Sequence, residues 1–133
     1  QAEADSCLNT PPTLAIHLAG LVFDWIAESG GLAAMGAANR RKAATLYAAI
    51  DGSGGFYRAP VAVAHRSPVN VRFRLADDAL TEPFLAAAAS RGLHNLRGHR
   101  QVAGLRASLY NAMPQAGADA LAGFMAEFAG RHA

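Results

Sequence analysis

The sequence contains one cysteine and no long apolar run. Cys7 has no second cysteine to pair with, which excludes an internal disulfide and leads us to expect a reducing, cytoplasmic compartment. The most apolar stretch, residues 14–26, is shorter than the ~20 residues that a membrane-spanning helix needs, and His17 and Asp24 interrupt it. We therefore expect no membrane partner.

Motifs for metals, hydrolases and dinucleotides are also missing. The five histidines stand singly, without HExxH or CxxC spacing, and the chain has neither a GxSxG elbow nor a glycine-rich loop between a strand and a helix. We predict no metal site. His17 lies on an apolar helical stripe and is interpreted as a core histidine. Asp24 and Glu28 stand one helical turn apart, but no His or Cys joins them, which favours a solvated face.

Lysine is scarce as well. Eleven of the twelve cationic residues are arginines, and the formal net charge is only +2. This excess is too small to indicate nucleic acid by itself, and the predicted strands lack surface aromatics on which bases could stack, so no nucleic-acid partner is expected. The one lysine, Lys42, follows Arg40 and Arg41 within a predicted helix, and we interpret the three as a solvated face.

Periodicity predicts the fold class. Apolar residues recur at helical spacing over about 14–30, 32–50, 77–92 and 121–128, whereas residues 69–75 and 105–110 alternate as strands with one buried face. A further strand is possible at 56–63. With 133 residues, this order predicts an α/β (α+β) two-layer sandwich in which helices cover one face of a small mixed or antiparallel sheet. Residues 1–13, with a stiff turn at Pro11 and Pro12, form a linker before a domain at 14–133.

Residues 98–111, GHRQVAGLRASLYN, carry the candidate site. His99 and Arg100 lie in a glycine-flanked loop, and Arg106 follows on the polar face of a strand. A guanidinium presents a planar fork of donors that fits a carboxylate or phosphate at two points, and an imidazole adds another donor. This pattern is consistent with docking of a doubly anionic small molecule. A solvated loop followed by the polar face of a half-exposed strand accounts for the same residues.

Four segments resemble the C-terminal part of the phosphoserine aminotransferases, which are fold-type I pyridoxal-phosphate enzymes. They are NTPPT at 9–13, GLVFDWI at 20–26, IDGSGGFY at 50–57 and GHRQVAGLRASLYNAM at 98–113. The resemblance runs in the same order along nearly the whole chain. It implies the small domain of an enzyme that exchanges an amino group between glutamate and 3-phosphohydroxypyruvate in serine biosynthesis, with a related phosphorylated hydroxythreonine step in pyridoxine biosynthesis.

The resemblance also implies roles for individual residues. Asn9 and Thr10 contact the phosphate of pyridoxal 5'-phosphate in the other subunit of a homodimer. His99 and Arg100 contribute to the site for the substrate's phosphate, and Arg106 binds the substrate's α-carboxylate. Glutamate and phosphoserine are thus the implied small-molecule partners.

One departure from these enzymes is important. Their chemistry needs a lysine that links to the cofactor, and they carry it in a large N-terminal domain. Lys42 matches no such lysine, and the chain begins at Gln1. We therefore expect a piece of a longer enzyme that is inactive alone and self-associates through unmatched apolar surface. A stand-alone anion-binding module without catalysis is the alternative.

Overall fold

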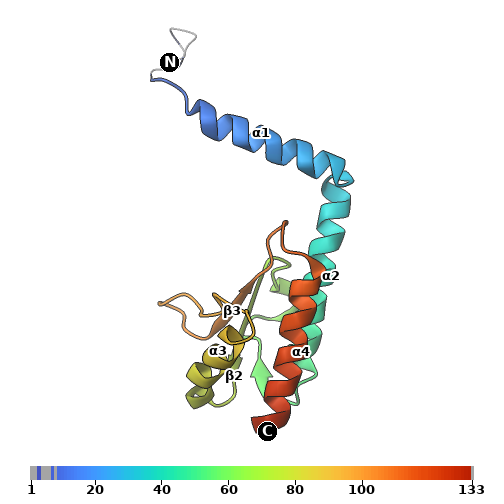
Figure 1. The fold of residues 1–133 in the computed structure, drawn as a ribbon, viewed down its shortest axis with the longest axis vertical. Coiled ribbons are helices and arrows are strands. Elements are labelled where there is room, and N and C mark those ends of the chain that lie inside the picture. Colours follow the sequence, from blue (N-terminus) through green and yellow to red (C-terminus); the bar gives the residue numbers. More distant parts are fainter. Residues whose placement is uncertain (1–2, 4–6, 8, 133) are drawn as a thin grey trace. The chain divides into compact units, whose positions relative to one another are not determined.

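The computed structural model describes residues 3, 7 and 9–132 (Figure 1). The elements follow in the order α1 (Thr13–Glu28), α2 (Gly31–Asp51), β1 (Tyr57–Arg58), β2 (Asn70–Leu75), α3 (Thr81–Ala89), β3 (Leu105–Ser108) and α4 (Gln115–His132), with short 3₁₀ turns at Val63–His65 and Asp78–Leu80. No single helix in the described part of the chain is long and apolar enough to cross a membrane.

Contacts divide the chain into two compact units, residues 1–35 and 36–133, called here the N-terminal unit and the main unit. This division follows contact density within the chain. The assignment of residues 1–13 as a linker and 14–133 as a domain stays a prediction.

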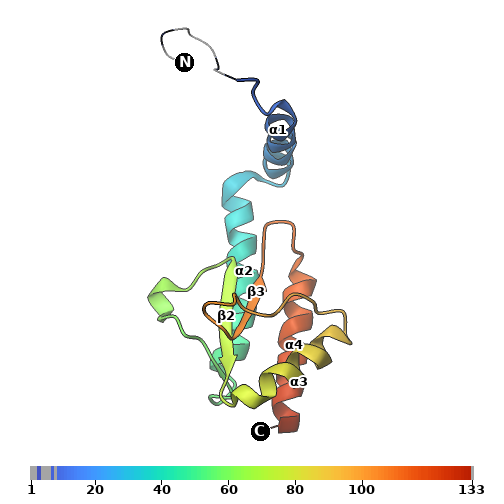
Figure 2. The same ribbon diagram turned by 90° about the vertical axis from the view of Figure 1, so that its left-hand side faces the viewer.

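The main unit contains a three-stranded antiparallel sheet in the order β1-β2-β3, and Figure 2 shows β2 and β3 side by side. β2 and β3 pair from Asn70 opposite Ser108 to Phe73 opposite Leu105, and the short β1 pairs with the end of β2. The strands at 70–75 and 105–108 confirm those predicted from alternation, and β1 lies within the segment where a further strand was possible. The predicted fold class is confirmed.

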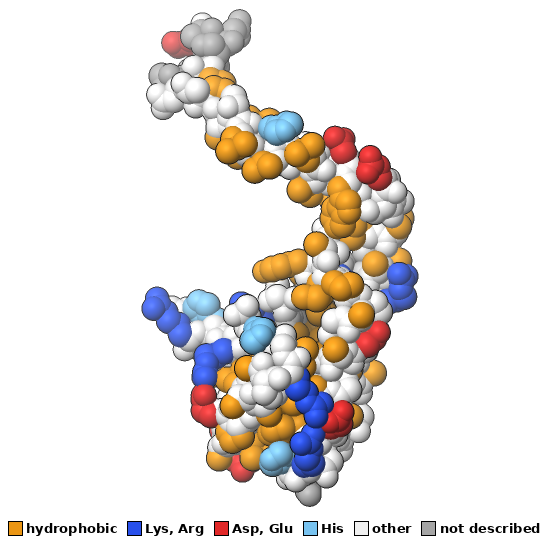
Figure 3. Space-filling model, viewed as in Figure 1, with side chains coloured by type: hydrophobic (Ala, Val, Ile, Leu, Met, Phe, Trp, Pro, Cys, Tyr) orange, Lys and Arg blue, Asp and Glu red, His pale blue; other side chains and the backbone are white. Residues whose placement is uncertain are grey.

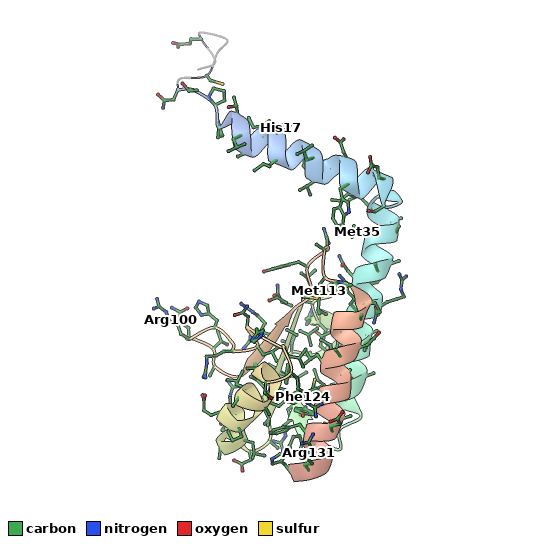
Figure 4. All side chains as sticks on the ribbon, in the orientation of Figure 1. His17, Met35, Arg100, Met113, Phe124 and Arg131 are labelled. Atoms are coloured by element: carbon green, nitrogen blue, oxygen red, sulfur yellow. The ribbon has the colours of Figure 1, made fainter. Side chains whose placement is uncertain are left out.

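One face of the sheet forms the core. Val71, Phe73 and Leu75 on β2 are buried, as are Leu105 and Ala107 on β3, and they belong to one cluster with residues of α2, α3 and α4. Aromatic rings fill its centre: the ring centroid of Phe84 on α3 lies 5.0 Å from that of Phe124 on α4 in an edge-on arrangement, and Figure 4 shows Phe124 within this core. The alternate, polar residues of β2 and β3 lie on the other face, where Arg74 is exposed and Asn70, Arg72, Arg106 and Ser108 are half-buried.

The apolar stripe of α1 is not part of this core. No residue of α1 is buried, and Figure 3 shows hydrophobic side chains exposed along the helix. The interpretation of His17 as a core histidine is wrong, because its side chain is exposed (Figure 4). A helical stripe is buried only where a second surface packs against it. Asp24 and Glu28 are exposed, as expected for a solvated face.

Lys42 also differs from the prediction. Arg40 and Arg41 are exposed, but Lys42 is only 2% exposed, so its interpretation as part of a solvated face is wrong. The physical reason is its position on α2, where it shares the buried stripe with Asn39 and Leu46. Its Nζ donates hydrogen bonds to three backbone carbonyl oxygens that follow β3, those of Leu109 (3.3 Å), Tyr110 (2.9 Å) and Met113 (2.9 Å). Burial lowers the pKa of this ammonium.

Candidate anion-binding site

Residues 98–104 form a closed loop before β3. The backbone N–H of Gly98 donates to the carbonyl oxygen of Gly104 at 2.9 Å, and the carbonyl oxygen of His99 accepts from the N–H groups of Val102 and Ala103. A Cβ at position 98 would lie 2.6 Å from the carbonyl oxygen of Ala103, which leaves room only for glycine. Gly98 and Gly104, the first and last residues of GHRQVAG, therefore close the loop, and His99 and Arg100 lie between them.

His99 and Arg100 share a cavity of about 430 Å³ with two further arginines. Arg97 is already neutralised, since its guanidinium donates to both carboxylate oxygens of Glu82 at 2.7 and 2.6 Å and holds the pKa of Glu82 below its usual value. Arg74 and Arg100 have no ion-paired acid among the described residues. Asp78 supplies one carboxylate to the lining. The cavity thus offers cationic donors to an anion.

The ring of His99 is oriented by its own loop. Its Nδ1 lies 3.3 Å from the backbone nitrogen of Gln101 and accepts that N–H. A neutral imidazole whose Nδ1 accepts carries its proton on Nε2. His99 therefore has an Nε2–H donor available for an anion, and Figure 4 shows the neighbouring Arg100 extending from the loop.

Arg106 lines a different cavity. It lies on the polar face of β3, directly opposite Arg72 on β2, and borders a cavity of about 490 Å³ together with His94, Asn95 and Tyr110. Its Nε is buried and has no hydrogen-bond partner among the described residues. A buried N–H without an acceptor costs free energy, and a carboxylate would remove that cost.

The structure thus brings together only part of the predicted site. His99 and Arg100 share one cavity, and Arg106 lines another in the same unit. Asn9 and Thr10 belong to the N-terminal unit, are exposed and line neither cavity.

Sequence reasoning missed two features near these residues. Arg74 was placed on the polar face of its strand but not associated with the loop at 98–104, whose cavity it lines. Asn39 and Lys42 were not connected with the segment after β3, although Asn39 Nδ2 donates to Asn111 Oδ1 at 2.7 Å. The three-residue spacing of Asn39 and Lys42 on an otherwise apolar stripe was the available signal.

Comparison with known proteins identifies the family. The model of the class-V aminotransferases matches residues 1–121. The chain belongs to the class-V aminotransferase family. Two curated relatives are phosphoserine aminotransferases: one from Acidithiobacillus ferrooxidans is 54% identical over 131 residues, 98% of this chain, and one from Stenotrophomonas maltophilia is 57% identical over 128 residues, 96% of this chain.

Solved structures of such aminotransferases agree with the fold. The phosphoserine aminotransferase from Bacillus circulans subsp. alkalophilus superposes with a TM-score of 0.92 at 45% identity, covering 99% of this chain and 37% of that one. The phosphoserine aminotransferase from Trichomonas vaginalis, solved with pyridoxal phosphate bound, gives 0.84 at 39% identity, covering 95% of this chain and 36% of that one. This class-V aminotransferase chain spans 36% of the length of both curated relatives.

Proposed function

We propose that this chain is the C-terminal part of a phosphoserine aminotransferase, which transfers an amino group between glutamate and 3-phosphohydroxypyruvate. The observation that carries the proposal is the pair of cationic cavities in a chain more than 50% identical to proteins of that name. Phosphoserine has two anionic ends, a phosphate and an α-carboxylate. One cavity is lined by Arg100 and His99 and the other by Arg106, so separate donors are available for the two ends.

Each end of the substrate is assigned to one of the two cavities. His99 and Arg100 bind the phosphate, through the Nε2–H of the imidazole and the fork of the guanidinium. Arg106 binds the α-carboxylate, and its unpartnered Nε is one of the donors. Within this division, the chain binds and orients the substrate and moves no proton.

The residues present do not fit covalent attachment of pyridoxal 5'-phosphate. When bound, the cofactor supplies the electron-withdrawing ring on which amino groups are exchanged, and it needs a lysine amine. Lys42, the chain's one lysine, is buried with its Nζ donating to three carbonyl oxygens. The cofactor lysine therefore belongs to the part of the enzyme outside this chain. Asn9 and Thr10, which are exposed, would contact only the cofactor's phosphate, in the other subunit of a homodimer.

The remaining assignments follow from the same family. We propose serine biosynthesis as the pathway, the phosphorylated hydroxythreonine step of pyridoxine biosynthesis as a second reaction, and the cytoplasm as the compartment. The lone cysteine supports a reducing environment.

The proposal is tested in the complete protein that carries this chain, supplied with pyridoxal phosphate, glutamate and 3-phosphohydroxypyruvate. Arg106→Gln should lower kcat/KM for both substrates by at least about tenfold, because both carry an α-carboxylate and each loses a charge-assisted hydrogen bond. Arg100→Gln should act mainly on the phosphorylated substrate. Arg41→Gln, which removes an exposed cation from α2, is the control. Wild-type protein without transamination would overturn the proposal.

The stand-alone module makes a different prediction for the 133-residue chain. It requires saturable binding of O-phosphoserine without cofactor, lost in Arg106→Ala. An isolated chain that neither binds O-phosphoserine nor turns over with pyridoxal phosphate, beside an active complete protein, would exclude the module and leave the aminotransferase.

A further inference from the structure

We propose that Arg74 positions the loop at 98–104 and is a third contact for the substrate's phosphate, beside His99 and Arg100. Neither the sequence reasoning nor the family resemblance assigns Arg74 a role. The inference rests on the proposed function, since it concerns the phosphate site of the same enzyme.

Arg74 makes a direct bond to the loop. Its Nη2 donates to the carbonyl oxygen of Val102 at 2.8 Å, joining β2 to a residue 28 positions later. In the described part of the chain, this is the only side-chain hydrogen bond between residues 98–104 and an element outside them. The other hydrogen bonds of these residues lie within the loop, apart from those that continue the backbone pairing into β3.

The stem of Arg74 also packs on the loop. A Cβ at Gly104 would lie 2.8 Å from Arg74 Cγ and 3.4 Å from its Nε, and Gly104 has φ +71°, in the left-handed region that favours glycine. Glycine at position 104 therefore leaves space for the stem of Arg74 and allows the left-handed turn. Because Arg74 contacts the loop at Gly104 and at Val102, it fixes the loop on both sides of Ala103.

Charge is the second part of the inference. Arg74 lines the cavity that contains His99 and Arg100. Arg97, the remaining arginine of that cavity, is bound to Glu82, whereas Arg74 has no ion-paired acid among the described residues. A guanidinium has five N–H donors, so one bond to a carbonyl leaves donors for a phosphate oxygen.

The chain offers a matched control for Arg74. Arg58 on β1 is its direct cross-strand partner. Arg58 is exposed, also bonds a backbone carbonyl through its Nε (Gly55, 3.4 Å), and does not line the cavity. Arg58→Gln therefore removes the same charge from the adjacent strand without touching the loop.

The experiment uses the complete, pyridoxal-phosphate-loaded protein, with O-phosphoserine and 2-oxoglutarate as substrates in one direction and glutamate and 3-phosphohydroxypyruvate in the other. Arg74→Gln should raise KM for O-phosphoserine about tenfold, with a much smaller effect on KM for glutamate, as expected for loss of one charge-assisted hydrogen bond to a phosphate. Arg74→Lys, which keeps the charge and a donor, should recover most of the loss, and Arg58→Gln should behave as wild type. In ligand-free protein, amide hydrogen exchange at residues 99–104 should be faster in Arg74→Gln and unchanged in Arg58→Gln.

The outcomes separate this inference from the function on which it rests. Unchanged KM and loop exchange in Arg74→Gln, with KM still raised in His99→Gln and Arg100→Gln, would overturn the inference and leave the phosphate assignment standing. Equal increases in KM for Arg74→Gln and Arg58→Gln would show that the effect comes from net charge alone, and this would also overturn the inference. If His99→Gln and Arg100→Gln leave KM unchanged, the phosphate assignment fails and the inference fails with it.

Discussion

Arg72 on β2 and Arg106 on β3 lie directly opposite each other in the sheet. The backbone N–H of Arg106 donates to the carbonyl oxygen of Leu96 at 2.8 Å, away from β2. The two arginines are therefore a non-hydrogen-bonded pair, the arrangement in which facing side chains are closest. Neither has an ion-paired acid in the described part of the chain. Their repulsion opposes folding and favours an anion beside Arg106.

Replacing Arg72 should relieve this repulsion. We expect Arg72→Thr to raise the free energy of unfolding by about 0.2–1 kcal/mol, since like charges directly opposite in a sheet are destabilising by that order. Urea titration at low salt measures the gain, which should shrink at 1 M salt, where the screening length falls to about 3 Å. Arg41→Gln is the control for net charge. A gain in Arg41→Gln as large as that in Arg72→Thr would contradict the pairwise explanation.

Lys42 should be a strong determinant of stability. Lys42→Met keeps the apolar stem but leaves the carbonyl oxygens of Tyr110 and Met113 without the ammonium, so we expect a loss of about 1–3 kcal/mol. Thermal and urea unfolding measure the loss, and Arg41→Met, on the exposed side of the same helix, should change little. Equal stabilities of the two variants would show that the three carbonyl contacts contribute nothing.

The sequence predicted the elements but not their polar contacts, and Lys42 shows why. Alternation and helical spacing report which face of an element is apolar, and they located β2, β3 and the helices around them. A lysine is assigned to solvent by type, because an unpaired buried ammonium is unfavourable. Here three carbonyl oxygens from a segment 67–71 residues away satisfy it. Only tertiary structure brings those oxygens to α2.

The candidate site was likewise predicted only in part from the sequence. His99 and Arg100 were predicted from one local motif, and the structure places them in one cavity because a short closed loop determines their separation. Arg74 was recognised only as a polar strand residue, since its bond to Val102 spans 28 positions. The stripe on α1 predicted a helix correctly, but periodicity does not say what covers it.

The Asp51–Arg66 pair should make part of the stability depend on acid. Arg66 donates to both carboxylate oxygens of Asp51, at 2.6 and 2.8 Å, and this holds the pKa of Asp51 below its ordinary value of 3.8 in the folded chain. A carboxyl with a lowered folded-state pKa stabilises when ionised. Its contribution is complete above the unfolded-state pKa and is lost as the pH falls through the folded-state pKa.

Asp51→Asn measures that contribution. At pH 7 we expect it to lower the free energy of unfolding by less than about 1 kcal/mol, since Asp51 is half exposed and solvent screens the pair. The difference from wild type should disappear below the folded-state pKa of Asp51. Asp24→Asn, which removes an exposed carboxylate from α1, is the control. A difference that persists undiminished in strong acid would show that the ion pair is not its cause.

The exposed face of α1 should make the isolated chain self-associate. Seven large apolar side chains of α1 are exposed, from 39% at Trp25 to 70% at Leu14, and contiguous apolar surface of this kind is rare on a monomer. Light scattering should show a mass that rises with concentration. Replacing Leu18 and Leu21 together by glutamine should reduce the association, whereas His17→Gln on the same helix should not. A chain that stays monomeric at high concentration would contradict the prediction. Association unchanged by the double substitution would place the contact elsewhere than on α1.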